Sequence, residues 1–178
     1  GSDASNMRTF AERNGDNYIV NGTKNWVTNG ISSDIVILMC MTEKNVGYKG
    51  ISTFIVEKSN GGFSTGKKED KLGIRGSDTC ELYFDDCKVP IENRLGDDGE
   101  GFKIALGTLD GGRVGIATQA LGIAAESLAR SIEYAKERKQ FGKSIGTFQL
   151  MQGKIADMYT TMNASRAYLY ATAVAADA

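Results

Sequence analysis

The feature that most constrains the fold of this chain is an abrupt change of pattern near residue 99 of its 178 residues. Before that point, short runs rich in β-branched and aromatic residues alternate with glycine and asparagine, which is typical of strands joined by turns. After it, apolar residues recur three or four positions apart over long stretches, which is typical of helices. We therefore predict an α+β chain with a β domain over residues 1–98 and a helical domain over residues 99–178.

The first half contains a series of predicted strands with a spacing of about ten residues and no helix between them, which indicates an antiparallel barrel or sandwich. Asn14-Gly15 favours a tight hairpin between the first two strands, because both residue types tolerate positive φ. Pro90, the only proline, suits a strand end because it has no N–H to donate to a ladder. The predicted strands are residues 8–12, 17–20, 35–41, 51–57 and 79–84.

The second half contains two predicted helices that Gly142 and Gly146 separate, so we expect an antiparallel helical pair with a corner between the helices. Each helix would bury one apolar stripe against the other and leave another stripe that needs a partner. This unfinished face, together with the lack of a helix stop signal at Ala178, predicts an internal fragment of a larger protein. The stripes are Leu121, Ala124, Leu128, Ile132 and Ala135 in the first helix, and Phe148, Met151, Ile155, Met158, Met162 and Leu169 in the second.

Composition and charge argue against several classes of function. A net charge of −1 does not favour nucleic-acid binding through bulk electrostatics. No apolar run approaches the roughly 20 residues that a membrane span needs, and the start shows neither a signal-peptide nor a transit-peptide pattern. The absence of histidine argues against zinc, histidine-base and Ser-His-Asp sites, so we expect no metal. Cys40, Cys80 and Cys87 form no CxxC pair, and we expect reduced, partly buried thiols of an intracellular protein.

A cluster of basic residues marks the corner between the two helices. Arg138 offers a planar fork that suits a pyrophosphate, and Lys139 and Lys143 add point charges. The alternative is a solvated basic turn at a helix C-terminus, where the helix dipole favours cations. Gly142-Lys143-Ser144 is not a phosphate loop, because position 137 is glutamate and a helix precedes it. The corner therefore indicates either a site for a phosphate-bearing ligand or an exposed turn.

Two further segments suggest ligand contact, and each has a structural alternative. Trp26 lies two residues before Thr28, and strand alternation would place both on one face. The pair could line a flat heteroaromatic ring, or it could be a core tryptophan beside a strand threonine. Gly111 and Gly112 lie inside a helical pattern at a cost of about 1 kcal/mol each relative to alanine. Close approach of a ligand or of another helix would explain these glycines.

Several separated motifs, in one order, make the chain resemble the acyl-CoA dehydrogenase family, closest to its short-chain (butyryl-CoA) and isovaleryl branches. The resemblance covers essentially all of the chain. It implies a middle β-barrel domain, truncated at its N-terminal edge, followed by the first two helices of a C-terminal four-helix bundle. The motifs are Gly1-Ser2-Asp3, Asn21-Gly22-Thr23-Lys24-Asn25-Trp26-Val27-Thr28-Asn29-Gly30, Lys71-Leu72-Gly73-Ile74-Arg75-Gly76-Ser77, Leu109-Asp110-Gly111-Gly112-Arg113 and Arg138-Lys139-Gln140-Phe141-Gly142.

The resemblance implies FAD-dependent α,β-dehydrogenation of a short-chain acyl-CoA thioester. In that chemistry a glutamate removes the α-proton while the β-hydride passes to the flavin. Electrons then leave through an electron-transfer flavoprotein, and FAD contacts across subunits imply a homodimer or homotetramer. In the isovaleryl branch the glutamate lies within the Leu-Asp-x-x-Arg segment, where this chain has Gly112, so we expect the base downstream and assign no catalytic residue here. The implied compartment is the bacterial cytoplasm or the mitochondrial matrix.

The resemblance also implies a role for individual residues. The FAD contacts that it implies are Trp26, Val27 and Thr28 at the flavin ring, Arg138, Lys139 and Gln140 at the pyrophosphate, and Phe148 and Gln149 at the adenosine portion. The substrate contacts that it implies are Ser2 and the CoA-binding segment Asp110, Gly111, Gly112 and Arg113, with Tyr48, Lys49 and Lys103 as further candidates.

Two other functions are compatible with the same residues. The fold could bind a CoA ester or a partner protein without redox chemistry, or it could belong to an acyl-CoA oxidase relative in which oxygen reoxidises the flavin. A downstream glutamate in a Tyr-Glu-Gly-Thr context would favour the dehydrogenase, and oxygen reactivity would separate the dehydrogenase from the oxidase. We also predict that the 178-residue piece alone does not dehydrogenate butyryl-CoA.

Overall fold

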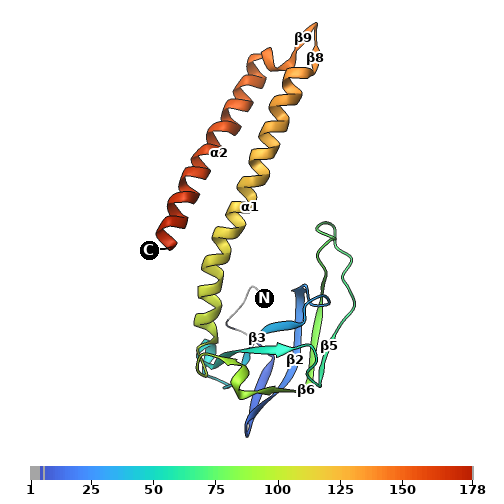
Figure 1. Ribbon diagram of the computed structural model, residues 1–178, viewed down its shortest axis with the longest axis vertical. Coiled ribbons are helices and arrows are strands. Elements are labelled where there is room, and N and C mark those ends of the chain that lie inside the picture. Colours follow the sequence, from blue (N-terminus) through green and yellow to red (C-terminus); the bar gives the residue numbers. More distant parts are fainter. Residues whose placement is uncertain (1–4, 6, 178) are drawn as a thin grey trace. The chain divides into compact units, whose positions relative to one another are not determined.

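The computed structural model describes residue 5 and residues 7–177. The chain divides into two compact units, one ending at Leu106 and the other beginning at Gly107. Both units are drawn in Figure 1.

The first unit is built on one seven-stranded sheet (Figure 1). Neighbouring strands are antiparallel except β1 and β3, which pair in parallel. The sheet of the first unit and the helices of the second confirm the α+β class. Within the described residues the sheet stays open and includes one parallel pair, so a closed, wholly antiparallel barrel is not confirmed. The order across the sheet is β5 (Phe63–Thr65), β6 (Thr79–Pro90), β2 (Asn17–Thr28), β1 (Phe10–Asn14), β3 (Ile35–Met41), β4 (Ile51–Glu57) and β7 (Arg94–Leu95).

The predicted strands all exist, and two of them, β3 and β4, have the predicted bounds. The β1–β2 hairpin is confirmed, because Asn14 pairs with Asn17 and Gly15 takes a φ of 61° in the turn between them. Both β2 and β6 run for 12 residues, longer than predicted, and pair with each other along most of that length. β6 ends at Pro90, as expected for a residue without a backbone donor.

The core of the first unit is a single apolar cluster between strands. The rings of Tyr18 and Phe54 pack at its centre with 4.7 Å between their centroids. Cys40, Cys80 and Cys87 are free and fully buried, more deeply than predicted. Burial disfavours the thiolate, and it raises the pKa of Cys40 to about 12. The other cluster members are Ala11, Val20, Leu38, Val56, Leu82, Phe84 and Val89.

The second unit is a helical hairpin made of most of α1 (Gly101–Glu137) and all of α2 (Gln149–Ala176). The helices run antiparallel (Figure 1), as predicted. The connection contains β8 (Lys139–Gln140), β9 (Lys143–Ser144) and the 3₁₀ turn η3 (Ile145–Thr147).

Two further 3₁₀ turns, η1 (Gly47–Gly50) and η2 (Ile91–Asn93), lie in the first unit. Among the described residues, no helix combines the length and apolar character that a membrane crossing requires.

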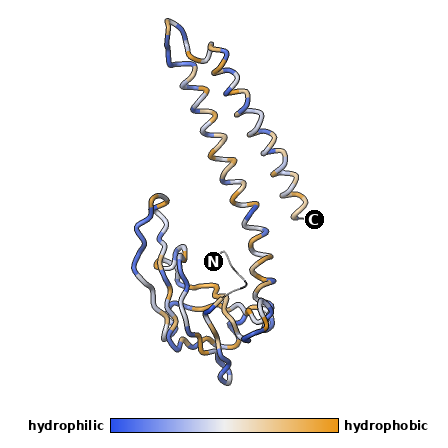
Figure 2. Tube along the Cα trace, turned by 180° about the vertical axis from the view of Figure 1, so that it is seen from behind, coloured by the Kyte–Doolittle hydropathy of each residue, from blue (hydrophilic) through white to orange (hydrophobic). Residues whose placement is uncertain are grey.

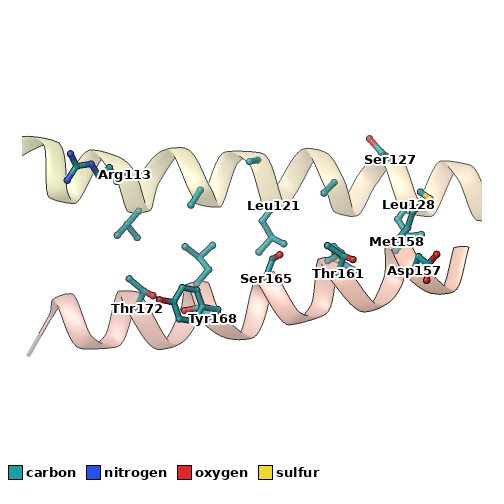
Figure 3. A pocket seen from close by; sticks show the side chains of 16 residues that line it. Arg113, Leu121, Ser127, Leu128, Asp157, Met158, Thr161, Ser165, Tyr168 and Thr172 are labelled. Carbon is teal, nitrogen blue, oxygen red and sulfur yellow. The ribbon is translucent and has the colours of Figure 1, made fainter. Parts of the chain in front are cut away.

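The apolar stripes of α1 and α2 face each other across a groove of about 870 Å³ instead of closing into a core. Figure 3 shows side chains such as Leu121 reaching from α1 toward α2, where Ser165 and Thr161 line the opposite wall. Leu128 and Ala135 are the stripe residues of α1 that are buried, and no described residue of α2 is buried. Apolar residues recur along both helices in Figure 2. The predicted stripes are therefore present, but they remain largely uncovered within the described chain.

Candidate functional site

A bulge near the end of β2 presents the segment predicted to contact a flavin ring. The register between β2 and β6 shifts between Lys24 and Val27, and Trp26 takes a φ of 60° there. Such a left-handed conformation costs a bulky residue about 1–3 kcal/mol. Trp26 is nevertheless 71% exposed, so the alternative of a core tryptophan is wrong. An exposed aromatic residue held in a strained conformation is typical of a ligand-contacting position.

The bulge also changes how the three predicted ring contacts lie. Simple alternation between Trp26 and Thr28 does not hold, because the positive φ at Trp26 interrupts the regular pleat. Trp26 and Thr28 are both exposed, whereas Val27 is partly buried and packs against the core cluster. Val27 therefore anchors the segment while its two neighbours remain accessible.

The turn that follows β2 is held by hydrogen bonds from two other parts of the first unit. The backbone N–H of Asn29 donates to the carbonyl oxygen of Asp78 at 2.9 Å. The Asp78 carboxylate accepts from the N–H of Ile31 at 2.8 Å and from the hydroxyl of Ser32 at 2.6 Å. These bonds, first that of Ser32 and then that of Ile31, lower the pKa of Asp78. In addition, Lys58 Nζ donates to the carbonyl of Ile31.

Sequence reasoning did not select Asp78, because the residue lies 47 positions after Ile31. Only the pairing of β2 with β6 brings the two together, and Thr28 lies opposite Thr79 in that ladder. An Asp just before a predicted strand is a weak signal on its own.

The corner between the helices is a short hairpin that carries the predicted phosphate-binding residues. Gln140 pairs with Lys143, and Phe141 and Gly142 form the two-residue turn with φ values of 52° and 79°. Positive φ at both positions is typical of a type I′ turn. Arg138 and Lys139 are exposed, and neither forms an ion pair with any residue that the structure describes. The basic groups of the corner are therefore accessible and not neutralised within the described chain.

Aromatic side chains lie beside these basic groups. The Phe141 ring, 92% exposed, packs edge-on against Phe148 with 6.2 Å between the centroids. Lys143 Nζ lies 4.7 Å from the centre of the Phe148 ring. Gln149 is the first residue of α2 and is exposed. The structure thus brings the predicted pyrophosphate and adenosine contacts together at one end of the helical hairpin, and it adds Phe141, which sequence reasoning did not select.

The predicted CoA segment lies on one exposed stretch of α1. Arg113 Nη1 pairs with Asp110 Oδ1 at 2.7 Å, and both side chains are largely exposed. A Cβ added at Gly111 or Gly112 would meet no atom within 4 Å, so packing inside the second unit does not explain these glycines. Arg113 also lies at one end of the groove between the helices (Figure 3).

The remaining substrate candidates lie in the first unit or outside the described residues. Tyr48 and Lys49 belong to η1 and are exposed. The Tyr48 ring packs on Phe102 with 5.1 Å between centroids, one residue before the exposed Lys103. These three candidates therefore lie near one another, whereas Ser2 falls outside the described residues.

A polar network in the first unit joins Tyr18, Arg94 and Asp98. The buried Tyr18 hydroxyl donates to Asp98 at 2.8 Å, and Arg94 Nη1 pairs with Asp98 at 2.9 Å. Burial, followed by the hydrogen bond to Asp98, raises the pKa of Tyr18. The network ties β2 to the loop that leads into α1, and we assign it a structural role.

Comparison with known proteins identifies the class of protein that carries these sites. The family model of the acyl-CoA dehydrogenase middle domain matches residues 1–87, and that of the acyl-CoA dehydrogenase C-terminal domain matches residues 99–178. The short-chain specific acyl-CoA dehydrogenase of Megasphaera elsdenii is 52% identical over 174 residues, which cover 97% of this chain and 45% of the relative. The chain belongs to the acyl-CoA dehydrogenase family, and it spans less than half the length of such relatives.

Solved structures show the same similarity. Butyryl-CoA dehydrogenase from Megasphaera elsdenii matches with a TM-score of 0.92 at 52% identity, over 96% of this chain and 45% of that one. A chain in a structure of the electron transferring flavoprotein of Acidaminococcus fermentans matches with a TM-score of 0.91 at 54% identity, over 96% of this chain and 45% of that one. The resemblance inferred from the sequence motifs is therefore confirmed.

Proposed function

We propose that the whole protein is an FAD-dependent acyl-CoA dehydrogenase that acts on a short-chain acyl-CoA thioester. In this proposal the present chain supplies contacts to FAD and CoA but not the catalytic base. The observation that carries it is Trp26, an exposed aromatic residue held at a φ of 60° beside the exposed Thr28. Family membership, and similarity to enzymes specific for short chains, supports the substrate class.

Each unit contains residues suited to one part of an FAD molecule, and the pyrophosphate contacts are implied across subunits. Trp26 offers an aromatic plane and Thr28 a hydroxyl for the flavin ring. Arg138 and Lys139 offer accessible cations for a pyrophosphate, which a planar guanidinium can bind in a bidentate manner. When bound, FAD supplies the acceptor for the hydride that leaves the substrate. Phe148 and Gln149, beside the basic corner, are positioned for the adenosine portion, and Gln140 extends the polar surface of the hairpin.

The exposed stretch of α1 is suited to the CoA portion of the substrate. Asp110 and Arg113 present one charge of each sign, and Gly111 and Gly112 leave the helix backbone open to close approach. No carboxylate occupies the Gly112 position, so in this proposal the α-proton is removed by a glutamate from another part of the protein. Tyr48, Lys49 and Lys103 are further candidates for substrate contact, together with Ser2.

The family resemblance suggests how the rest of the protein would be arranged. We place the boundary between the middle and C-terminal domains at residues 98 and 99. The uncovered groove between α1 and α2 supports completion of a four-helix bundle by further helices, because large apolar side chains would otherwise face water. A homodimer or homotetramer is proposed from the cross-subunit FAD contacts implied for Arg138. An electron-transfer flavoprotein is the proposed electron acceptor.

The test is the flavin absorbance of the full-length protein before and after addition of butyryl-CoA. We expect a yellow protein whose flavin absorbance bleaches on addition of butyryl-CoA, and turnover with an artificial acceptor. A protein that stays colourless after incubation with excess FAD would refute the proposal. Coloured protein without bleaching would instead favour a non-catalytic CoA-ester-binding protein, and rapid reoxidation by oxygen would favour an oxidase.

A further inference from the structure

The residue with the most unexplained set of contacts is Asp78, which precedes β6. It accepts three hydrogen bonds from a single turn: Asn29 N–H to its backbone carbonyl, and Ile31 N–H and the Ser32 hydroxyl to its carboxylate. That turn begins directly after Thr28, the last residue of β2. We propose that Asp78 is a positioning residue that sets the conformation of the Trp26–Thr28 segment and so the contacts of that segment with the flavin. The inference rests on the proposed function.

The segment needs such a restraint because its backbone is in an unfavourable conformation. Trp26 has a φ of 60°, a region that bulky residues rarely adopt, and Asn29, a residue type that tolerates this region, has the same φ. Conformations of this kind persist only where the surroundings impose them. The bulge at Trp26 removes regular ladder pairing there, since the register with β6 resumes only at Val27. Val27 and Thr28 pair again with β6, and the hydrogen bonds of Asp78 to the turn that follows add a further restraint on the segment.

The other contacts of the turn leave Asp78 as its main polar anchor in the loop before β6. Gly30 is buried and lies against Cys80, so it forms an apolar floor. Lys58 Nζ donates to the carbonyl of Ile31, which is a backbone contact outside the loop of Asp78. The hydroxyl of Ser77 donates to the Asn29 side chain at 3.2 Å, a longer bond than either carboxylate bond of Asp78. The loop before β6 is thus tied to the turn chiefly through its last residue.

The chemistry of the carboxylate matches the two donors that it meets. Both oxygens of an ionised aspartate accept, so one can serve a backbone N–H while the other serves a hydroxyl. An asparagine at position 78 would offer one oxygen and would turn an NH₂ group toward one donor. An alanine would leave the Ile31 N–H without its partner. The predicted order of function is therefore aspartate, then asparagine, then alanine.

Asp70, in the same loop, provides a matched control. It has the same side chain as Asp78, but its interaction is a 3.4 Å ion pair with Arg75 across an exposed surface. Exposed pairs of this kind contribute little to stability. Asp70→Asn makes the same charge change in the same loop without touching the turn.

The experiment compares four full-length holoenzymes: the wild type and the variants Asp78→Asn, Asp78→Ala and Asp70→Asn. Five quantities are measured: the visible spectrum of bound flavin, its reduction potential, kcat and KM for butyryl-CoA with an artificial acceptor, and the thermal midpoint. We expect kcat to fall on the order of tenfold in Asp78→Ala and less in Asp78→Asn, since small misplacements of positioning groups carry costs of this size or larger. The flavin spectrum and potential should shift in the same order, with KM changed less than twofold and Asp70→Asn within twofold of wild type throughout.

The outcomes test the positioning role of Asp78 separately from the proposed function of the whole protein. Normal kcat, spectrum and potential in both Asp78 variants would overturn the positioning role, even if the thermal midpoint fell. Should Asp78→Ala fail to fold, Asp78→Asn decides the question alone by the same criteria. A wild-type protein without flavin or turnover would overturn the proposed function, and this inference with it.

Discussion

Gly30→Ala is the substitution whose effect follows most directly from the structure. Gly30 is buried in the turn after β2, and a Cβ placed there would lie 2.6 Å from Cys80 Sγ and 3.1 Å from Leu82 Cδ2. Ordinary contacts between such atoms need about 3.5–4.0 Å, so the alanine and the sulfur must separate by about 1 Å. Cys80 is fully buried and cannot move toward solvent. The strain must therefore be absorbed by the turn or by the core.

The expected cost is that of overpacking a tight core, about 1–3 kcal/mol of unfolding free energy. A double-mutant cycle with Cys80→Ala identifies the cause. Cys80→Ala alone should cost about 1 kcal/mol for one lost buried group, but it removes the atom that the new methyl group strikes. The double variant should therefore lose less than the sum of the two single variants, with a coupling energy of about 1 kcal/mol or more.

Urea unfolding of the full-length protein, followed by circular dichroism and by flavin absorbance, measures these terms. Gly61→Ala is the control, because a Cβ there would meet no atom within 4 Å, and it should change stability by less than about 0.5 kcal/mol. Additive losses in the double variant would show that the contact with Cys80 is not the cause. Unchanged stability in Gly30→Ala would refute the packing argument altogether.

Three further outcomes are expected. Arg138→Gln should weaken FAD binding about tenfold or more, because charge-assisted hydrogen bonds contribute about 1.5–3 kcal/mol. Fluorescence titration of the apoprotein with FAD measures the Kd. An unchanged Kd would contradict the phosphate-binding role of Arg138. Tyr18→Phe should cost about 1–2 kcal/mol in urea unfolding, because Asp98 loses a buried donor. No loss would show that the remaining donors, Arg94 and Ser52, satisfy the carboxylate. Because the folded-state pKa of Asp78 is lowered, its contribution to stability is present above the unfolded value of about 3.9 and is lost as pH falls through the folded value. The difference in thermal midpoint between wild type and Asp78→Asn should therefore disappear in strong acid, and a difference that persists there would exclude a role for the charge.

The parts of the fold that could be predicted are those that local sequence determines. β3 and β4 have the predicted bounds because their apolar runs are bracketed by turn residues. The β1–β2 hairpin was predictable because Gly15 supplies the positive φ of the turn, although Asn14 itself ends β1 and the turn residues are Gly15 and Asp16. The parallel pairing of β1 with β3 was not predictable, since a contact between Phe10 and Met41 leaves no local trace. The short strands β5 and β7 were missed because two or three residues are too few to show a period.

The candidate site also contains some residues that could be predicted from local sequence and others that could not. Motifs selected Trp26 and Arg138 because their chemistry is visible in the residue type. The bulge at Trp26 depends instead on how β2 is registered against β6, which is a tertiary property. Asp78 was missed for the same reason, since its partners are distant in sequence.

The two units differ in whether contacts within the described chain account for the conformation of their candidate sites. The turn after Trp26 is restrained on several sides by residues of the first unit, so its geometry does not require an external partner. On α1, by contrast, a Cβ at Gly107, Gly111, Gly112, Gly115 or Gly122 would meet no atom within 4 Å. Each of these glycines costs a helix about 1 kcal/mol relative to alanine, and no packing inside the second unit offsets that cost. Substituting them by alanine should therefore stabilise the isolated helical hairpin. In the whole protein, the same changes should impair any contact that another part of the protein or a ligand makes with that backbone. The contrast between the two stability measurements would show which glycines lie in such a contact.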